Sequence, residues 1–230
     1  ICYNGAMEFV LVRHVETQGN IERRFNGITE SEYSPFGVEM NALLLKELKE
    51  IASGRTDVQI LTSPTRRAAC LAETLAESLG AEAVGEPALL EFNFGVFDGL
   101  TPEEAEERDR EAYFSWMNDH LHVRIPEGDS YEQKYEESAG WIGRLVKQTE
   151  KTERETGTQQ TIFMISHGAT VRCMLTALLD LPLDAGWHID IPLGGIAIVK
   201  YSGDYGILSR LYTPDYQGGN TAGYSKKFIR

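Results

Sequence analysis

Residues 8–13 read Glu-Phe-Val-Leu-Val-Arg (EFVLVR), and His14 follows them directly. This apolar run is too short for a helix and is typical of a buried strand. Further runs have the same character: 58–62 (VQILT), 161–166 (TIFMIS) and 196–201 (IAIVKY), with 206–212 as a hairpin partner for the last. We therefore expect these runs to build the central sheet.

Helical patterns separate the predicted strands. Apolar residues recur at helical spacing over 36–52 and 64–79, and further helices are expected over 130–155 and 169–179. Ser63 is the expected N-cap of the helix over 64–79, with Pro64 in its first turn. Because strands and helices alternate, the sequence predicts an α/β fold, a three-layer α/β/α sandwich with a mostly parallel central sheet.

Segment 101–137 departs from this alternation. It has no strand pattern, it opens with a capping box at Thr101–Glu104, and its acidic residues greatly outnumber its basic ones. We expect residues 1–230 to form a single domain in which 101–137 is a helical cap-like insertion. A solvated helical surface is the simpler interpretation of its charge, and a cap over a site at the sheet edge is the alternative.

Amino-acid composition restricts the classes of binding partner and the cellular location that we expect. The net charge is −13, which repels nucleic acid and anionic membranes. No apolar run approaches the ~20 residues of a membrane span, and the N-terminal ICYNGAM lacks a secretory signal pattern. The three cysteines are widely spaced and fit a reducing compartment. We expect a cytoplasmic protein that acts on a small molecule, with no nucleic-acid or membrane partner; a homodimer is left open.

Two histidines follow predicted strands. His14 ends the first strand and His167 follows 161–166, with Arg13 and Arg172 nearby in sequence. Ligands of parallel α/β sheets bind beyond the carboxyl ends of the strands, so both histidines can face one pocket. A satisfied structural histidine is the simpler interpretation for either one alone.

A third predicted strand ends just before Arg66 and Arg67. Both arginines are expected in the first turn of the following helix, where the helix dipole opposes a cation. An anionic ligand would offset that cost. For Arg66 we expect a solvent-facing side chain instead.

Five motifs in register resemble the histidine phosphatase superfamily, the phosphoglycerate mutase-like proteins. They run in family order from residue 8 to about 181 and are Arg13-His14 with Asn20, Ser63-Pro64 with Arg67, residues 90–99 with Glu91, residues 126–130 (PEGDS), and Ser166-His167-Gly168 with Arg172. The resemblance implies phosphoryl transfer through a phosphohistidine, with His14 as nucleophile and Glu91 as proton donor. It implies neither a metal nor another cofactor, because the arginines supply the positive charge.

The resemblance also implies roles for the remaining motif residues. His167, if protonated, adds a third cation. The implied catalytic set is His14, Glu91, Arg13, Arg67 and His167. The implied substrate-binding set is Arg13, Asn20, Asn26, Gly27, Arg67, His167 and Gly168.

One position departs from the family pattern, because Val15 stands where the motif has glycine. If that position requires a positive φ, a β-branched residue is strained there, and we expect a reduced rate. The leading hypothesis is a metal-independent phosphomonoesterase of the histidine acid phosphatase type, a hydrolase. The alternatives are a phosphoglycerate mutase-type phosphotransferase and a non-catalytic binder of phosphorylated ligands. Residues 113–117 (YFSWM) lack the arginine pair of the superfamily's mutases, which favours hydrolysis.

Overall fold

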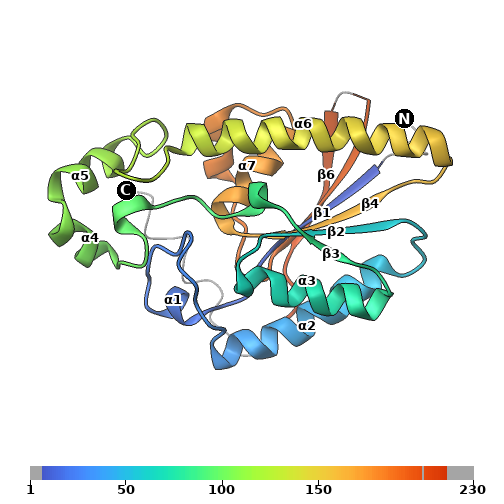
Figure 1. The fold of residues 1–230 in the computed structure, drawn as a ribbon, viewed down its shortest axis with the longest axis horizontal. Coiled ribbons are helices and arrows are strands. Elements are labelled where there is room, and N and C mark those ends of the chain that lie inside the picture. The colour runs from blue at the N-terminus through green and yellow to red at the C-terminus, as the bar shows by residue number, and fades with distance from the viewer. Residues whose placement is uncertain (1–6, 204, 217–230) are drawn as a thin grey trace.

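The sheet has the strand order β3-β2-β4-β1-β5-β6 in the computed structural model, which describes residues 7–203 and 205–216 (Figure 1). The strands are β1 (Met7–Arg13), β2 (Val58–Thr62), β3 (Ala83–Gly85), β4 (Thr161–Ser166), β5 (Ile196–Ser202) and β6 (Tyr205–Tyr212). The first four are mutually parallel, whereas β5 runs antiparallel to β1 and β6 antiparallel to β5. The mostly parallel sheet is therefore confirmed.

Strand β3 is the one strand of this sheet that the sequence analysis missed. It has only three residues, none of them buried, and Val84 is largely exposed at the sheet edge. A strand this short and this exposed carries no alternating or continuous apolar pattern.

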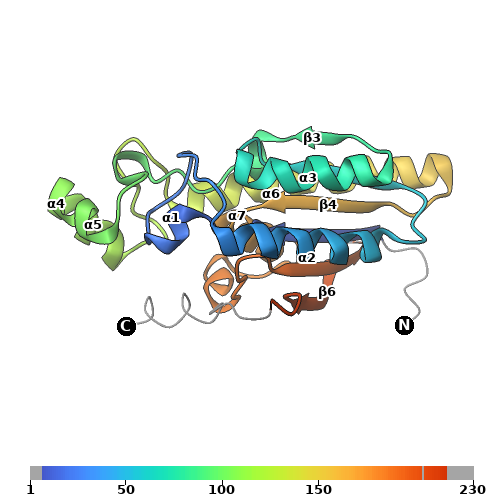
Figure 2. The ribbon, with the colours of Figure 1, turned by 90° about the horizontal axis from the view of Figure 1, so that it is seen from below.

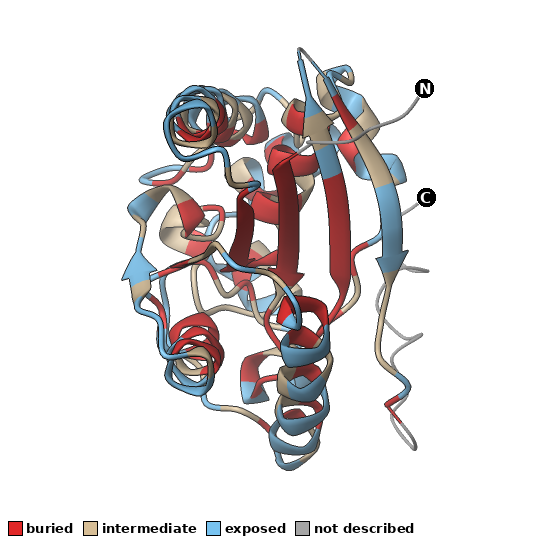
Figure 3. Ribbon diagram, turned by 90° about the vertical axis from the view of Figure 1, so that its right-hand side faces the viewer, coloured by how far each residue is buried: buried red, intermediate tan, exposed pale blue. Residues whose placement is uncertain are grey.

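Helices cover both faces of the sheet. Helices α2 (Pro35–Ala52) and α3 (Arg66–Leu79) share one apolar core with Val10 and Val12 of β1. Helices α6 (Tyr131–Thr156) and α7 (Gly168–Leu178) share the other with Phe9 and Leu11. Alternate residues of a strand point to opposite faces, so one apolar strand feeds both cores. Figure 3 shows the central strands buried between the two layers, as the three-layer prediction requires.

A smaller group of helices lies beyond one end of the sheet (Figures 1 and 2). It contains α4 (Pro102–Arg108) and α5 (Arg110–Asn118), and α4 begins with the predicted capping box at Thr101. A third core sits beneath these helices, with Phe97, Tyr113 and Trp116 among its members. The predicted insertion boundary at residue 137 falls inside α6, which runs unbroken from the Ser130 cap. The division into a core and a cap remains a proposal.

Shorter elements complete the described chain: α1 (Gln18–Ile21) and the 3-10 turns η1 (Pro87–Leu89), η2 (Gly95–Phe97) and η3 (Leu183–His188). Among the described residues no helix is both long enough and apolar enough to cross a membrane. Residues 1–6, on which the signal-peptide expectation largely rests, lie outside the described residues.

The predicted start of α3 was wrong by two residues. The helix begins at Arg66 with Thr65 at the N-cap, so Pro64 precedes the helix and Ser63 does not cap it. The physical reason lies in the tertiary structure, because the Ser63 hydroxyl is instead bonded to His167.

Candidate active site

The structure brings His14 and His167 together at the carboxyl ends of adjacent strands. Strands β1 and β4 pair in parallel register, with Arg13 opposite Ser166, so the residues that follow them emerge side by side. The two imidazole centroids lie 5.1 Å apart, and both rings are buried. The predicted shared location of the two histidines therefore holds in the structure.

The backbone sets the tautomer of His14. Its Nδ1 lies 2.7 Å from the carbonyl oxygen of Val15. A carbonyl only accepts, so Nδ1 carries the proton and Nε2 carries the lone pair. The pKa of His14 is lowered well below its ordinary value by burial first, and then by the positive charges of Arg67 and Arg13. The ring is thus held neutral.

His167 is also held as a neutral imidazole, with the opposite tautomer. Its Nδ1 accepts a hydrogen bond from Arg67 Nε at 3.3 Å, and a guanidinium can only donate. Its Nε2 therefore carries the proton and donates to Ser63 Oγ at 2.8 Å, with Thr65 Oγ1 at 3.2 Å. Burial and the charge of Arg67 lower the pKa of His167 well below the ordinary range. The conditional third cation of the sequence analysis is therefore disfavoured in this state.

Ser63 and Thr65 were missed as site residues. The sequence carried a signal for them, because both hydroxyls lie between the end of a predicted strand and a motif arginine. Ser63 was instead predicted as a helix N-cap, and only the packing of β2 beside β4 brings both hydroxyls to the His167 ring.

Arg67 is fully buried and binds mostly to backbone. Nη1 donates to the carbonyl of Thr29 at 2.8 Å, and Nη2 donates to those of Asn26 and Gly27 at 3.1 and 2.5 Å. With the bond to His167, these contacts use four of the five guanidinium N–H groups. Burial lowers the pKa of Arg67, although a guanidinium stays charged. Arg67 thus places a positive charge near His14 and fixes residues 26–29 (hereafter the 26–29 loop) through hydrogen bonds to their carbonyls.

The amides of that loop bind a residue that the sequence analysis did not single out. The N–H groups of Gly27 and Thr29 both donate to the carboxylate of Asp98, as does the Thr29 hydroxyl. The 90–99 motif includes Asp98, so the sequence drew attention to this segment. The sequence did not show that Asp98 accepts hydrogen bonds from Gly27 and Thr29.

Arg13 and Gly168 pack against each other. A Cβ added at Gly168 would lie 3.2 Å from Arg13 Cζ, so the bare backbone lets the guanidinium lie against the start of α7. Arg13 Nη1 donates to the carbonyl of Ile191 at 2.7 Å. Arg172 is directed elsewhere: its Nε donates to Ile189, and its guanidinium lies over Trp187. Arg66 is exposed, as expected, and pairs with Glu73.

The two predicted asparagines differ in surroundings. The Oδ1 of Asn20 accepts hydrogen bonds from the Thr17 amide and hydroxyl and so closes the start of α1. The Nδ2 of Asn26 is buried against Gly19 and has no hydrogen-bond partner within the described part of the chain. A buried amide donor without a partner is costly, and an anion at this position would satisfy it.

Glu91 lies at the first turn of α7, the helix whose N-cap residue is His167. Its carboxylate accepts hydrogen bonds from the backbone amides of Ala169 at 3.2 Å and Thr170 at 3.1 Å. The Phe92 amide also donates to it, and the Thr170 hydroxyl, which donates to the Leu90 carbonyl, lies 3.2 Å from it. Amides at a helix N-terminus favour a negative charge, so this placement gives the carboxylate one defined orientation.

Val15 is accommodated without backbone strain. Its φ is not positive, and its side chain is fully buried in the core beneath α2 and α3. The carbonyl that orients His14 is supplied by the backbone, which any residue provides. The condition for strain at Val15, a positive φ, is therefore not met.

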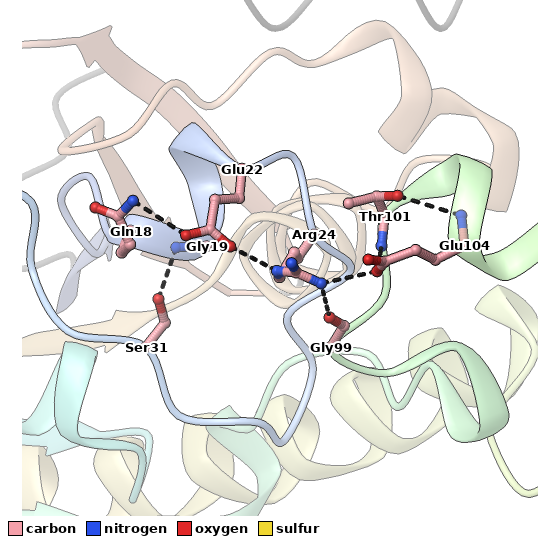
Figure 4. A network of polar contacts seen from close by, with 8 residues as sticks. All are labelled: Gln18, Gly19, Glu22, Arg24, Ser31, Gly99, Thr101 and Glu104. Carbon is pink, nitrogen blue, oxygen red and sulfur yellow. Dashed lines mark hydrogen bonds and ion pairs between the residues drawn. The ribbon is translucent and has the colours of Figure 1, made fainter.

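Polar contacts tie the segment around α1 to the start of α4 (Figure 4). Arg24 donates to Glu22 at 2.7 Å, to Glu104 at 2.8 Å and to the Gly99 carbonyl at 2.9 Å. Glu104 in turn closes the capping box with Thr101. Arg24 is thus one side chain that links the segment around α1 to the start of α4.

No cluster of three or more histidine, cysteine or acidic side chains that could hold a metal occurs within residues 7–203 and 205–216. His122 is hydrogen-bonded to Asp119, and the His120 ring packs against Trp187.

Comparison with known proteins assigns the family. The model of the histidine phosphatase superfamily (branch 1) matches residues 9–213, and the chain belongs to this superfamily. Phosphoserine phosphatase 1 of Hydrogenobacter thermophilus is 28% identical over 181 residues, which cover 79% of this chain and 80% of that protein. The Yersinia pestis protein named "Probable phosphoglycerate mutase GpmB" is 30% identical over 200 residues, 85% of each chain.

Solved structures share the fold. The alpha-ribazole phosphatase from Shigella flexneri matches with a TM-score of 0.78 at 22% identity, over 90% of this chain and 97% of that one. The resemblance to the superfamily that the sequence motifs indicated is confirmed.

Proposed function

We propose that the protein is a metal-independent phosphatase that hydrolyses a small phosphomonoester through a phosphohistidine on His14. Membership of a superfamily of phosphatases and mutases supports an enzyme. The observation that carries the proposal is the arrangement of His14: a buried neutral imidazole with its lone pair on Nε2, beside two arginines and a second imidazole.

In the first step, His14 Nε2 attacks phosphorus and forms the N–P bond while the bond from phosphorus to the leaving oxygen breaks. The bound phosphate dianion favours a proton on the neighbouring Glu91 carboxyl group, which then transfers that proton to the leaving oxygen. In the second step, Glu91 takes a proton from water, and the water oxygen attacks phosphorus. The N–P bond then breaks, inorganic phosphate is released, and neutral His14 is restored.

The charge on the transferred phosphoryl group is met by donors that are already in place. Phosphoryl transfer depends mainly on positioning and electrostatics. Arg13 and Arg67 supply the positive charge, and Asn26 supplies a buried amide donor with no other partner among the described residues. His167 holds Arg67 by accepting from its Nε. Asn20, Gly27 and Gly168 serve by shaping the backbone around this position.

The first experiment measures hydrolysis of p-nitrophenyl phosphate in the presence of EDTA. We expect the wild type to turn over and His14→Asn to fall to background, because the substitution removes the proposed nucleophile. His122→Asn is the matched control, an exposed histidine bonded only to Asp119 among the described residues, and should keep full activity. Absence of wild-type turnover would favour the non-catalytic binder.

The second experiment tests Glu91 as the proton donor. In Glu91→Gln, hydrolysis of an alkyl ester such as O-phosphoserine should fall by about 10²–10⁴-fold, because its leaving alkoxide needs a proton. Hydrolysis of p-nitrophenyl phosphate, whose phenolate leaves unaided, should fall much less. An equal loss for both substrates would remove Glu91 from this role.

A mutase is the second candidate, favoured by the 30% identity to the Yersinia pestis protein. A mutase returns the phosphoryl group to an acceptor, so incubation with 3-phosphoglycerate would give 2-phosphoglycerate rather than inorganic phosphate. We expect phosphate release. The physiological substrate is proposed only as a small phosphorylated metabolite, and the cytoplasm remains the predicted location.

A further inference from the structure

Asp98 binds the 26–29 loop by accepting three short hydrogen bonds. Its Oδ1 accepts from the Gly27 amide at 2.6 Å, and its Oδ2 accepts from the Thr29 amide at 2.8 Å and the Thr29 hydroxyl at 2.6 Å. These lengths are typical of charge-assisted bonds, which are roughly twice as strong as neutral ones. The carboxylate therefore fixes the loop from the side of the 90–99 motif.

Arg67 binds the same loop by donating hydrogen bonds to its carbonyl groups. It donates to the carbonyls of Asn26, Gly27 and Thr29, while Asp98 takes the amides of Gly27 and Thr29. The loop thus lies between a carboxylate and a guanidinium, and bonds in such a chain polarise one another. A loop released from Asp98 would also move the carbonyls that orient Arg67.

The position of Arg67 matters for the site because its Nε donates to His167 and its charge helps keep His14 neutral. Asn26, which carries the buried amide donor, belongs to the same loop. We propose that Asp98 is a positioning residue of the phosphate site, acting through the 26–29 loop on Arg67 and Asn26. This inference rests on the proposed function, because it assumes that the site binds a phosphoryl group.

The direction in which Asp98→Asn changes phosphate affinity distinguishes a positioning role of Asp98 from a purely electrostatic one. The Asp98 carboxylate acts electrostatically on Arg67, as do those of Glu91 and Glu30. Removing a negative charge near an anion site strengthens anion binding if only the field changes. Removing a group that positions the donors weakens it. Asp98→Asn therefore gives opposite results under the two explanations.

The experiment is calorimetric titration of each variant with inorganic phosphate, below the onset of unfolding. We expect Asp98→Asn to raise the Kd for phosphate about tenfold or more, because an amide cannot accept all three bonds and turns a donor toward the loop. Glu30→Gln is the matched control. Glu30 is an exposed carboxylate that also interacts electrostatically with Arg67, but it accepts a hydrogen bond from the Arg66 amide rather than from the loop. The Kd of Glu30→Gln for phosphate should therefore equal that of the wild type or be lower.

Thr29→Val supplies a second, milder variant. It keeps the charge of Asp98 and removes only the hydroxyl bond, and we expect the Kd for phosphate to rise about three- to tenfold. If Asp98→Asn does not fold, this variant decides alone. Tighter or unchanged phosphate binding in either variant would overturn the inference while leaving the proposed function intact. A wild type that binds no phosphate would overturn both.

Discussion

Val15 shows how a single residue can depart from a motif and keep its chemistry. What His14 needs from this position is a carbonyl oxygen, and every residue has one. The valine side chain is turned away into the core shared with α2 and α3. The departure from glycine is therefore a matter of packing rather than of the reacting atoms.

Substitution of Val15 by glycine is predicted to destabilise the protein without raising its rate. Loss of the fully buried side chain and the added backbone freedom should together lower the free energy of unfolding by about 2–4 kcal/mol. Urea unfolding measures the stability, and p-nitrophenyl phosphate hydrolysis measures the rate. A faster enzyme would show that Val15 restrains the site after all.

Among the elements, the segment 17–29 and the helices α4 and α5 meet through a few specific contacts. The backbone of Phe25 exchanges hydrogen bonds with Gly99 and Leu100, and Arg24 adds its contacts to Gly99 and Glu104. Because Arg24 and Glu104 are partly exposed, their ion pair contributes little to global stability. We expect these contacts to affect the local stability of this junction instead.

Replacement of Arg24 by glutamine is predicted to loosen the junction locally. Amides of residues 99–105 should exchange hydrogen faster, while the urea midpoint stays close to that of the wild type. Hydrogen-exchange mass spectrometry resolves the two effects. Arg110→Gln, which removes the exposed ion pair between Arg110 of α5 and Glu106 of α4, is the control and should leave that exchange unchanged. Wild-type exchange rates in Arg24→Gln would mean that the backbone pairs alone hold the junction.

For the whole molecule, two buried neutral histidines make stability depend on pH. The pKa of both His14 and His167 lies below its unfolded value near 6.5. Between those values the unfolded chain binds more protons than the folded one. The stabilising contribution is therefore complete above about pH 6.5 and is lost as the pH falls toward the folded pKa values.

The prediction is a free energy of unfolding that declines as the pH is lowered from 6.5 to 5, by at most about 1.4 kcal/mol per pH unit for each histidine. Urea unfolding at a series of pH values measures it. His14→Gln should reduce the slope, whereas the exposed His122→Gln should not. A flat profile, or an unchanged slope in His14→Gln, would contradict the neutral buried state.

Much of the fold was predictable because its signals are local. The apolar runs at 8–13, 58–62 and 161–166 mark strands covered on both faces, and their bounds agree with β1, β2 and β4 to within one residue. The capping box at Thr101 likewise depends on neighbouring residues alone. Strand β3 was missed because its pairing with β2, rather than its own composition, makes it a strand.

The candidate site divides in the same way. Sequence alone determined which side chains are available: the two histidines, the arginines at strand and helix ends, and Glu91, all carried by motifs in family order. Only the tertiary structure decided what each one touches. Ser63 is hydrogen-bonded to His167 instead of capping a helix, Arg172 donates to the carbonyl of Ile189, and Asp98 accepts hydrogen bonds from the 26–29 loop. The physical reason is that such hydrogen bonds join residues far apart in the chain, so they are set by how the strands and loops pack.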